Sequence, residues 1–128
     1  MPILITITAG SVEVKAELND SPTARAISEV LPIKGIVRRW GEEIYFSIPL
    51  YAKLEPQGRE VVEPGELGYW PTGRAFCLFF GPTPASKGDE IRAASPVNII
   101  GTMTGPFSGL DAVAEGETIT IDACSRAN

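Results

Sequence analysis

Apolar and polar residues alternate along most of this chain, and turn residues interrupt the alternation about every ten positions. The first hairpin is predicted from residues 3–8 and 12–18, with a turn at residues 9–11. In its second strand, apolar residues take every other position and charged residues lie between them. This is the pattern of an antiparallel strand with one face buried and one face in water.

The same signals predict further strands along the chain. They are expected at residues 35–40, 43–50, 59–63, 67–70, 74–80, 97–103 and 117–123. Residues 81–96 form the longest irregular segment, which is either a functional loop or a solvated connection. Many short strands with frequent turns predict an all-β domain, either a sandwich or a closed barrel.

Helical signals occur at two places. Ser21 followed by Pro22 is typical of a helix start, and Pro32 ends the pattern, so a helix of about three turns is predicted between them. A short helical turn is expected at residues 110–114, closed by Gly116.

Length and composition indicate a single domain over residues 1–128. Apolar residues make up 44% of the chain and charged residues 21%, a mixture that is ordinary for a globular protein and unlike a disordered one. A chain of this size buries enough surface to fold without disulfides or metal.

The charge balance argues against nucleic acid as a partner. The net charge is −5, and the only adjacent basic pair is Arg38–Arg39, whereas phosphate backbones are bound by basic faces. The N-terminal segment has neither a basic region nor an apolar run long enough for a signal peptide or membrane span. Cys77 and Cys124 fit reduced thiols better than a disulfide, so we expect a cytoplasmic protein without membrane contact.

The chain contains no histidine. This excludes Ser-His-Asp and Cys-His catalysis and makes most zinc sites inaccessible to it. The glycines do not have the spacing of a phosphate-binding loop. We therefore expect no metal and no cofactor.

Two segments carry candidate binding chemistry. Residues 64–84 concentrate aromatic rings around Arg74, and residues 38–46 combine arginines and paired glutamates with Trp40 and Tyr45. Since neighbours in a strand face opposite sides, Tyr69 and Trp70 cannot both line one pocket. One of the two is expected in the core and the other at an interface or site. For the paired glutamates, a position in a solvated turn is favoured over a catalytic role.

Three motifs resemble a known family. WGEEIYFSIP at residues 40–49, PGELGYWPTGRAFCLFFGPTP at residues 64–84 and SPVNIIGT at residues 95–102 are similar to a small prokaryotic family of uncharacterised, cyclophilin-like proteins. The resemblance covers nearly the whole chain. It implies a closed antiparallel barrel of about eight strands, with one helix in the N-terminal half across an opening and a short C-terminal helical turn.

The resemblance does not transfer the activity of orthodox cyclophilins, which isomerise X-Pro bonds with an arginine followed by Phe and Gln at fixed spacing. This chain reproduces neither that spacing nor the pocket histidine. Enzymatic activity is therefore left open.

The favoured hypothesis is a binding module that holds a small molecule or short peptide in an aromatic and arginine pocket. Its candidate residues are Trp40, Glu43, Tyr45, Tyr69, Arg74, Phe80 and Asn98. The alternative is a weak or specialised peptidyl-prolyl isomerase acting on a proline-containing peptide. A subunit of a homo-oligomer without chemistry is also left open.

Overall fold

A computed structural model describes residues 3–124, and in this part of the chain one antiparallel sheet of ten strands accompanies a single α-helix. The strands are β1 (Ile3–Ala9), β2 (Val12–Leu18), β3 (Ile33–Ile36), β4 (Arg38–Arg39), β5 (Glu43–Ser47), β6 (Arg59–Val62), β7 (Glu66–Trp70), β8 (Ala75–Phe79), β9 (Ile91–Met103) and β10 (Thr118–Ala123). The helix is α1 (Pro22–Glu29), and two short 3-10 turns are η1 (Pro71–Gly73) and η2 (Ser108–Ala112). The expectation of a mainly β domain is confirmed.

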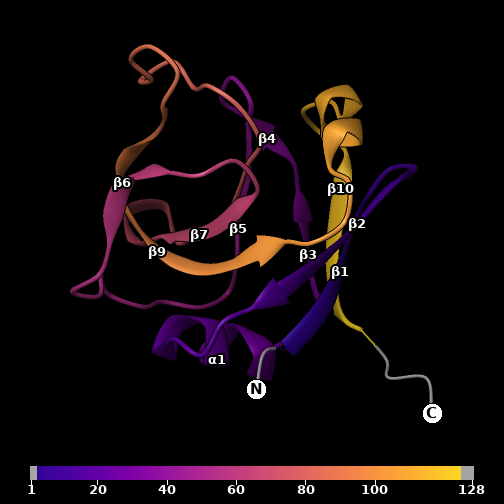
Figure 1. Ribbon diagram of the computed structural model, residues 1–128. Coiled ribbons are helices and arrows are strands. Elements are labelled where there is room, and N and C mark those ends of the chain that lie inside the picture. Colours follow the sequence, from indigo (N-terminus) through magenta and orange to yellow (C-terminus); the bar gives the residue numbers. More distant parts are fainter. Residues whose placement is uncertain (1–2, 125–128) are drawn as a thin grey trace.

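The sheet curls around one core but its hydrogen bonds do not close it (Figure 1). The strand order is β3-β10-β1-β2-β9-β7-β8-β5-β4, with β6 paired to β9. The predicted closed barrel is therefore not supported. The end strands β3 and β4 are consecutive in the chain, and Val37 between them donates to the Glu117 carbonyl (2.8 Å) and accepts from Gly116 (2.9 Å). β3 and β4 stand at the two ends of the hydrogen-bonded order and do not pair with each other.

The first hairpin confirms the alternation. β1 and β2 pair over their whole length, and their apolar positions face the core. The last strand behaves in the same way, with Ile119 and Ile121 fully buried.

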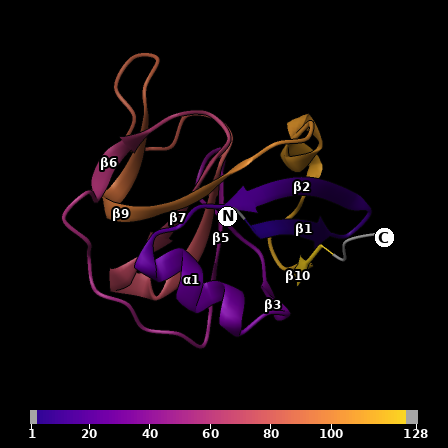
Figure 2. The same cartoon turned by 60° about the horizontal axis from the view of Figure 1, so that its bottom comes forward.

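The helix begins where predicted and ends earlier. The Ser21 hydroxyl accepts a hydrogen bond from the Ala24 N–H (3.2 Å), which is the expected N-cap. α1 ends at Glu29, so it is shorter than three turns. Ala24 and Ile27 are buried in the core, and the helix lies across one end of the curled sheet (Figures 1 and 2). The second helical signal corresponds to the 3-10 turn η2.

Strand β9 begins earlier than predicted, so the irregular segment is shorter than residues 81–96. The irregular connection ends at Glu90, and β9 starts at Ile91 instead of residue 97. Arg59 pairs with Val97, whereas Val61 pairs with Arg92, so the intervening part of β9 bulges out of the ladder with β6. This bulge accommodates Pro96, which has no N–H to donate and which concealed the strand in the sequence.

Strands β5, β8 and β7 separate two apolar clusters. The inner one fills the curled sheet and includes Ile44, Phe46 and Phe76. The outer one lies beneath β6 and the first half of β9, and it includes Cys77 and Phe79. Alternation along the same strands therefore supplies both clusters. Within residues 3–124, no helix has the length and apolar character needed to cross a membrane.

Candidate functional site

A pocket opens on the outer face of β5 and β7, beside β9. Its seven lining residues are Trp40, Glu43, Tyr45, Trp70, Ala93, Ala94 and Val97, and its volume is about 190 Å³. Three of the residues predicted from the sequence, Trp40, Glu43 and Tyr45, are thus brought together. Trp70, the residue whose side the sequence left open, joins them.

The strand register explains the position of these side chains. Ile44 and Phe46 fill the interior, so Glu43 and Tyr45 on the same strand point outward. Tyr45 pairs with Cys77 of β8, and the Tyr45 and Trp70 rings meet edge to face, with centroids 6.3 Å apart and planes at 84°. Two aromatic walls therefore stand nearly perpendicular to each other.

Backbone contacts fix the other side of the pocket. The Trp40 N–H donates to the Glu43 carbonyl (3.0 Å), and the Glu43 N–H donates to the Trp40 carbonyl (3.2 Å). Gly41 in this turn has φ +62°, and a Cβ there would lie 2.9 Å from the Pro82 carbonyl oxygen. A glycine is required by both the backbone conformation and the close approach. The turn sets Trp40 beside Glu43.

The Trp70 indole is also held in place. Its N–H donates to the Ser95 hydroxyl in the bulge of β9 (2.6 Å). This hydrogen bond uses the polar atom of the ring and leaves its apolar surface for the pocket.

Glu43 places a carboxyl group in this apolar environment. The residue is only 5% exposed, and burial raises its pKa to about 7, although the facing Cys77 thiol offsets part of the rise. Burial raises the pKa of Cys77 itself well above its usual value. None of the ion pairs among residues 3–124 includes Glu43. Near neutral pH the carboxyl can therefore gain or lose a proton with little change in conditions.

Comparison with known proteins identifies the fold. The sequence profile of the family described as cyclophilin-like matches residues 3–122. The chain belongs to this family. The resemblance predicted from the three motifs is confirmed.

A solved relative has the same architecture. The solution structure of a hypothetical protein from Archaeoglobus fulgidus is 40% identical in sequence and superposes with a TM-score of 0.83. The match covers 96% of this chain and 95% of that one. A search among curated proteins finds no match.

Two of the other candidate residues of this cyclophilin-like chain lie away from the pocket. Tyr69 is fully buried inside the sheet, where its hydroxyl donates to the Leu50 carbonyl (2.8 Å) and accepts from the Ala52 N–H (3.1 Å). Arg74 is exposed after η1 with φ +49°, and its guanidinium lies 5.3 Å from the centre of the Tyr51 ring.

Phe80 and Asn98 are also separate from the pocket. The Arg39 guanidinium lies 5.3 Å from the centre of the Phe80 ring, at a different hollow near η2. Asn98 is buried and its amide bonds to the Thr23 hydroxyl, the Lys53 carbonyl and the Glu55 N–H at 2.7–3.0 Å. These bonds tie α1 to β9 and to the connection before β6.

Sequence reasoning did not identify the β9 wall. Ala93 and Ala94 were assigned to the irregular segment of residues 81–96, because Pro96 interrupts the strand pattern, and Val97 was assigned to the start of the next strand. The sequence left open which of Tyr69 and Trp70 faces the core, and the register decides it by placing Tyr69 opposite the buried Phe76 and Trp70 opposite Ala75. Nothing in the linear pattern locates β9 over Trp70.

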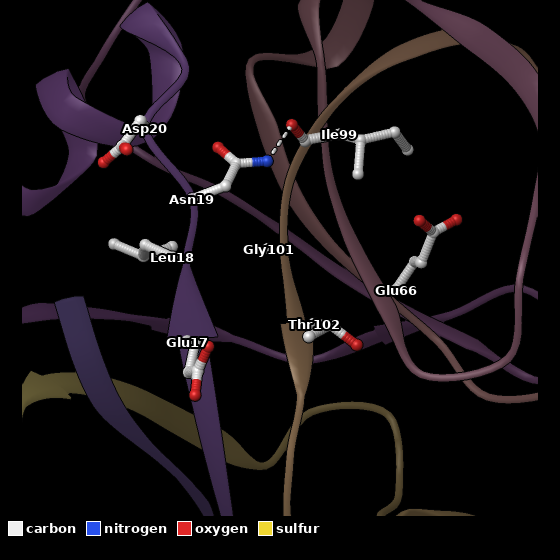
Figure 3. Close-up of a pocket in the computed structure, with 8 residues that line it drawn as sticks. All are labelled: Glu17, Leu18, Asn19, Asp20, Glu66, Ile99, Gly101 and Thr102. Carbon is white, nitrogen blue, oxygen red and sulfur yellow. Dashed lines mark hydrogen bonds between the residues drawn. The ribbon is translucent and has the colours of Figure 1, made fainter. Parts of the chain in front are cut away.

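A larger hollow of about 340 Å³ lies between β2 and β9, and Figure 3 shows the residues that line it. It carries acidic side chains, including Glu17 and Glu66, and the Asn19 amide donates to the Ile99 carbonyl (2.9 Å). Glu66 is already paired with Arg59 through two contacts of 2.9 Å. No aromatic ring lines this hollow, and no group of three or more His, Cys, Asp or Glu within residues 3–124 could hold a metal ion. The pocket at Glu43 is the better candidate for specific recognition.

Proposed function

We propose that this protein is a binding module that recognises a small ligand, or one side chain of a short peptide, in the pocket formed by Trp40, Glu43, Tyr45 and Trp70. The observation that carries the proposal is the convergence of three aromatic rings on one buried carboxyl group. Concave apolar sites with few well-placed polar groups are the usual form of ligand pockets.

The rings are not needed by the core of the curled sheet. Trp40, Tyr45 and Trp70 are each only partly buried, while the interior is filled by residues of the opposite parity. Large aromatic surfaces left partly open to water gain free energy when a ligand covers them. Tyr45 and Trp70 also pack against the outer apolar cluster, and the part of each ring that stays open to water is available to a ligand.

The buried carboxyl supports the same proposal. Removing Glu43 from water costs free energy, as its raised pKa indicates, and no described ion pair compensates for that cost. Groups that are perturbed in this way and that lie in a pocket are candidates for function.

An extended ligand is favoured by a second hollow next to the pocket. It shares Tyr45 and Trp70 and continues to Arg38 and Gly73. A peptide lying along this face would reach both hollows. This supports peptide binding. Support for the isomerase alternative is weaker, because the seven residues of the pocket include no arginine to contact a prolyl carbonyl. A cytoplasmic location is kept as a prediction.

The two tryptophans of the chain provide the test, since both line the pocket. The probes are choline, 3,3-dimethylbutanol and the peptide Ala-Ala-Pro-Phe, each titrated while the two indole N–H resonances are recorded. We expect at least one probe to shift both resonances with a saturable curve, and Trp70→Leu to abolish binding. Tyr51→Ala, which removes a 65% exposed ring outside the pocket, is the matched control. If no probe shifts either resonance, the proposed function is wrong.

A further inference from the structure

We propose that the pocket binds a methylated ammonium group, held by the rings of Trp40, Tyr45 and Trp70 and neutralised by the Glu43 carboxylate. The inference rests on the proposed function and names the chemical class of the ligand. It predicts that a cation is preferred to an uncharged group of the same shape.

The aromatic walls provide the first argument. A cation is attracted to the face of an aromatic ring, most strongly to tryptophan, and quaternary ammonium groups are recognised by several rings around one charge. This pocket has two tryptophans and a tyrosine, and the rings of Tyr45 and Trp70 are nearly perpendicular. Rings in that arrangement contact a roughly spherical head group from two directions.

The Glu43 carboxyl has the Cys77 thiol as a hydrogen-bond partner but no described cationic partner, and this is the second argument. Arginines on β6 and β9 are engaged elsewhere: Arg92 pairs with Glu60 and Glu90, and Arg59 pairs with Glu66. Glu43 has no described cationic partner, and the whole chain carries a net charge of −5. A ligand cation would supply the missing countercharge in a site of low dielectric constant, where such pairing is strong.

The lining distinguishes a methylated ammonium from other cations. A primary ammonium has three N–H donors to satisfy, and among the lining side chains only the Glu43 carboxylate and the Tyr45 hydroxyl can accept from them. The remaining side chains are aliphatic or aromatic surface, which methyl groups can contact without losing hydrogen bonds. A hard metal ion needs several oxygen ligands, and Glu43 is the single carboxylate among the residues that line the pocket. Methyl groups present apolar surface to apolar walls. A volume of about 190 Å³ suits a head group better than a whole peptide.

The side chains that face Glu43 leave its carboxyl as the group whose protonation changes when a cation binds. Cys77 on β8 and Tyr45 on β5 are the titratable groups that face it, and β9 contributes only Ala93, Ala94 and Val97. On β4, Arg38 is exposed in the adjacent hollow, with Glu115 3.8 Å away. Binding of a cation therefore favours loss of the proton from Glu43, so affinity and proton release are coupled.

The test compares choline with 3,3-dimethylbutanol, in which carbon replaces the charged nitrogen. Both are titrated into the wild-type protein at a pH above 8, with the indole N–H resonances as readout. We expect choline to bind at least about tenfold more tightly. Equal affinity for the two compounds would overturn the cation inference and leave the proposed function standing. Binding of Ala-Ala-Pro-Phe alone would also overturn the cation inference and leave the proposed function standing. Failure of all three probes to bind would overturn the cation inference and the proposed function together.

A pair of matched variants tests the role of the carboxyl. Glu43→Gln should weaken choline binding and reduce its preference over the neutral analogue to the part that the aromatic rings provide. Glu42→Gln removes the same charge from the adjacent, exposed position outside the pocket and should keep the preference. An unchanged preference in Glu43→Gln, in a variant whose indole resonances remain dispersed, would contradict the assignment. The wild-type comparison needs no variant, so it stands even if Glu43→Gln does not fold.

The source of the ligand is tested by comparing choline with N-acetyl-trimethyllysine amide. N-acetyl-trimethyllysine amide represents a methylated side chain of a peptide, and choline represents a free small molecule. Tighter binding of the first supports a peptide source, and tighter binding of the second supports a small metabolite. Equal binding of unmethylated N-acetyl-lysine amide would overturn the requirement for methylation.

Discussion

The inner and outer faces of β5, β8 and β7 use aromatic residues in different ways. On the inner face, Phe46 and Phe76 stack with centroids 5.5 Å apart, and the Tyr69 hydroxyl makes two hydrogen bonds. On the outer face, Tyr45 and Trp70 meet edge to face, remain partly exposed and adjoin the buried carboxyl of Glu43. Both faces carry a buried apolar cluster, but the outer face also has a pocket with a buried carboxyl group that lacks a cationic partner among the described residues. The difference teaches that parity along a strand decides which side chains fill the interior and which reach the pocket.

The largest expected effect concerns packing. Phe76→Ala should lower the free energy of unfolding by about 3–5 kcal/mol, because it leaves a cavity in the fully buried inner cluster. Tyr45→Ala on the outer face should cost about 1 kcal/mol, the order of one edge-to-face contact. Urea unfolding of the two variants measures both values. Equal losses would show that the outer face is part of the structural core.

Much of the fold could be predicted from the sequence because alternation is a local property. The hairpin of β1 and β2, the outward direction of Glu43 and Tyr45 and the N-cap at Ser21 all follow from neighbouring residues. The open ladder could not be predicted, since it depends on which strands, here β3 and β4, end the order of pairing between distant parts of the chain. The β9 wall was missed for a similar reason: the bulge that accommodates Pro96 exists only through pairing with β6. Trp40, Glu43 and Tyr45 were identified as a group, but their meeting with Trp70 depends on tertiary packing.

The second expected effect is a pH dependence of stability. Glu43 has a pKa of about 7 in the folded protein against 4.5 for an ordinary glutamate, so the folded state holds more protons between these values. The stability that the protonated Glu43 contributes to the folded state is therefore fully present below pH 4.5 and is lost as the pH rises through about 7. The difference between the two pKa values corresponds to a loss of about 3 kcal/mol in the free energy of unfolding at alkaline pH.

Glu43→Gln removes this dependence. At a pH above 8 the variant should be more stable than the wild type by about 3 kcal/mol, and the gain should shrink as the pH falls. Denaturant unfolding over the pH range measures the effect, with Glu42→Gln as control. A gain that is the same at every pH would mean that Glu43 does not titrate in this way.

A smaller effect is expected inside the sheet. Tyr69→Phe keeps the ring but removes the hydroxyl that bridges Leu50 and Ala52. The loss should be about 1–2 kcal/mol, because two backbone groups lose a partner. Thermal unfolding measures this change, and binding of probes at the outer pocket should be unaffected. A loss of binding without a loss of stability would place Tyr69 in the recognition site after all.

The central claim is that Glu43 is the countercharge for a cation on the outer face. The most direct measurement is the affinity of the wild-type protein for choline as the pH is raised from well below to well above 7. Because choline binds the ionised form, its affinity should rise by about tenfold per pH unit below the pKa of about 7 and then level off. The affinity for 3,3-dimethylbutanol should not rise over the same range. A choline affinity that stays constant across the range would contradict the account.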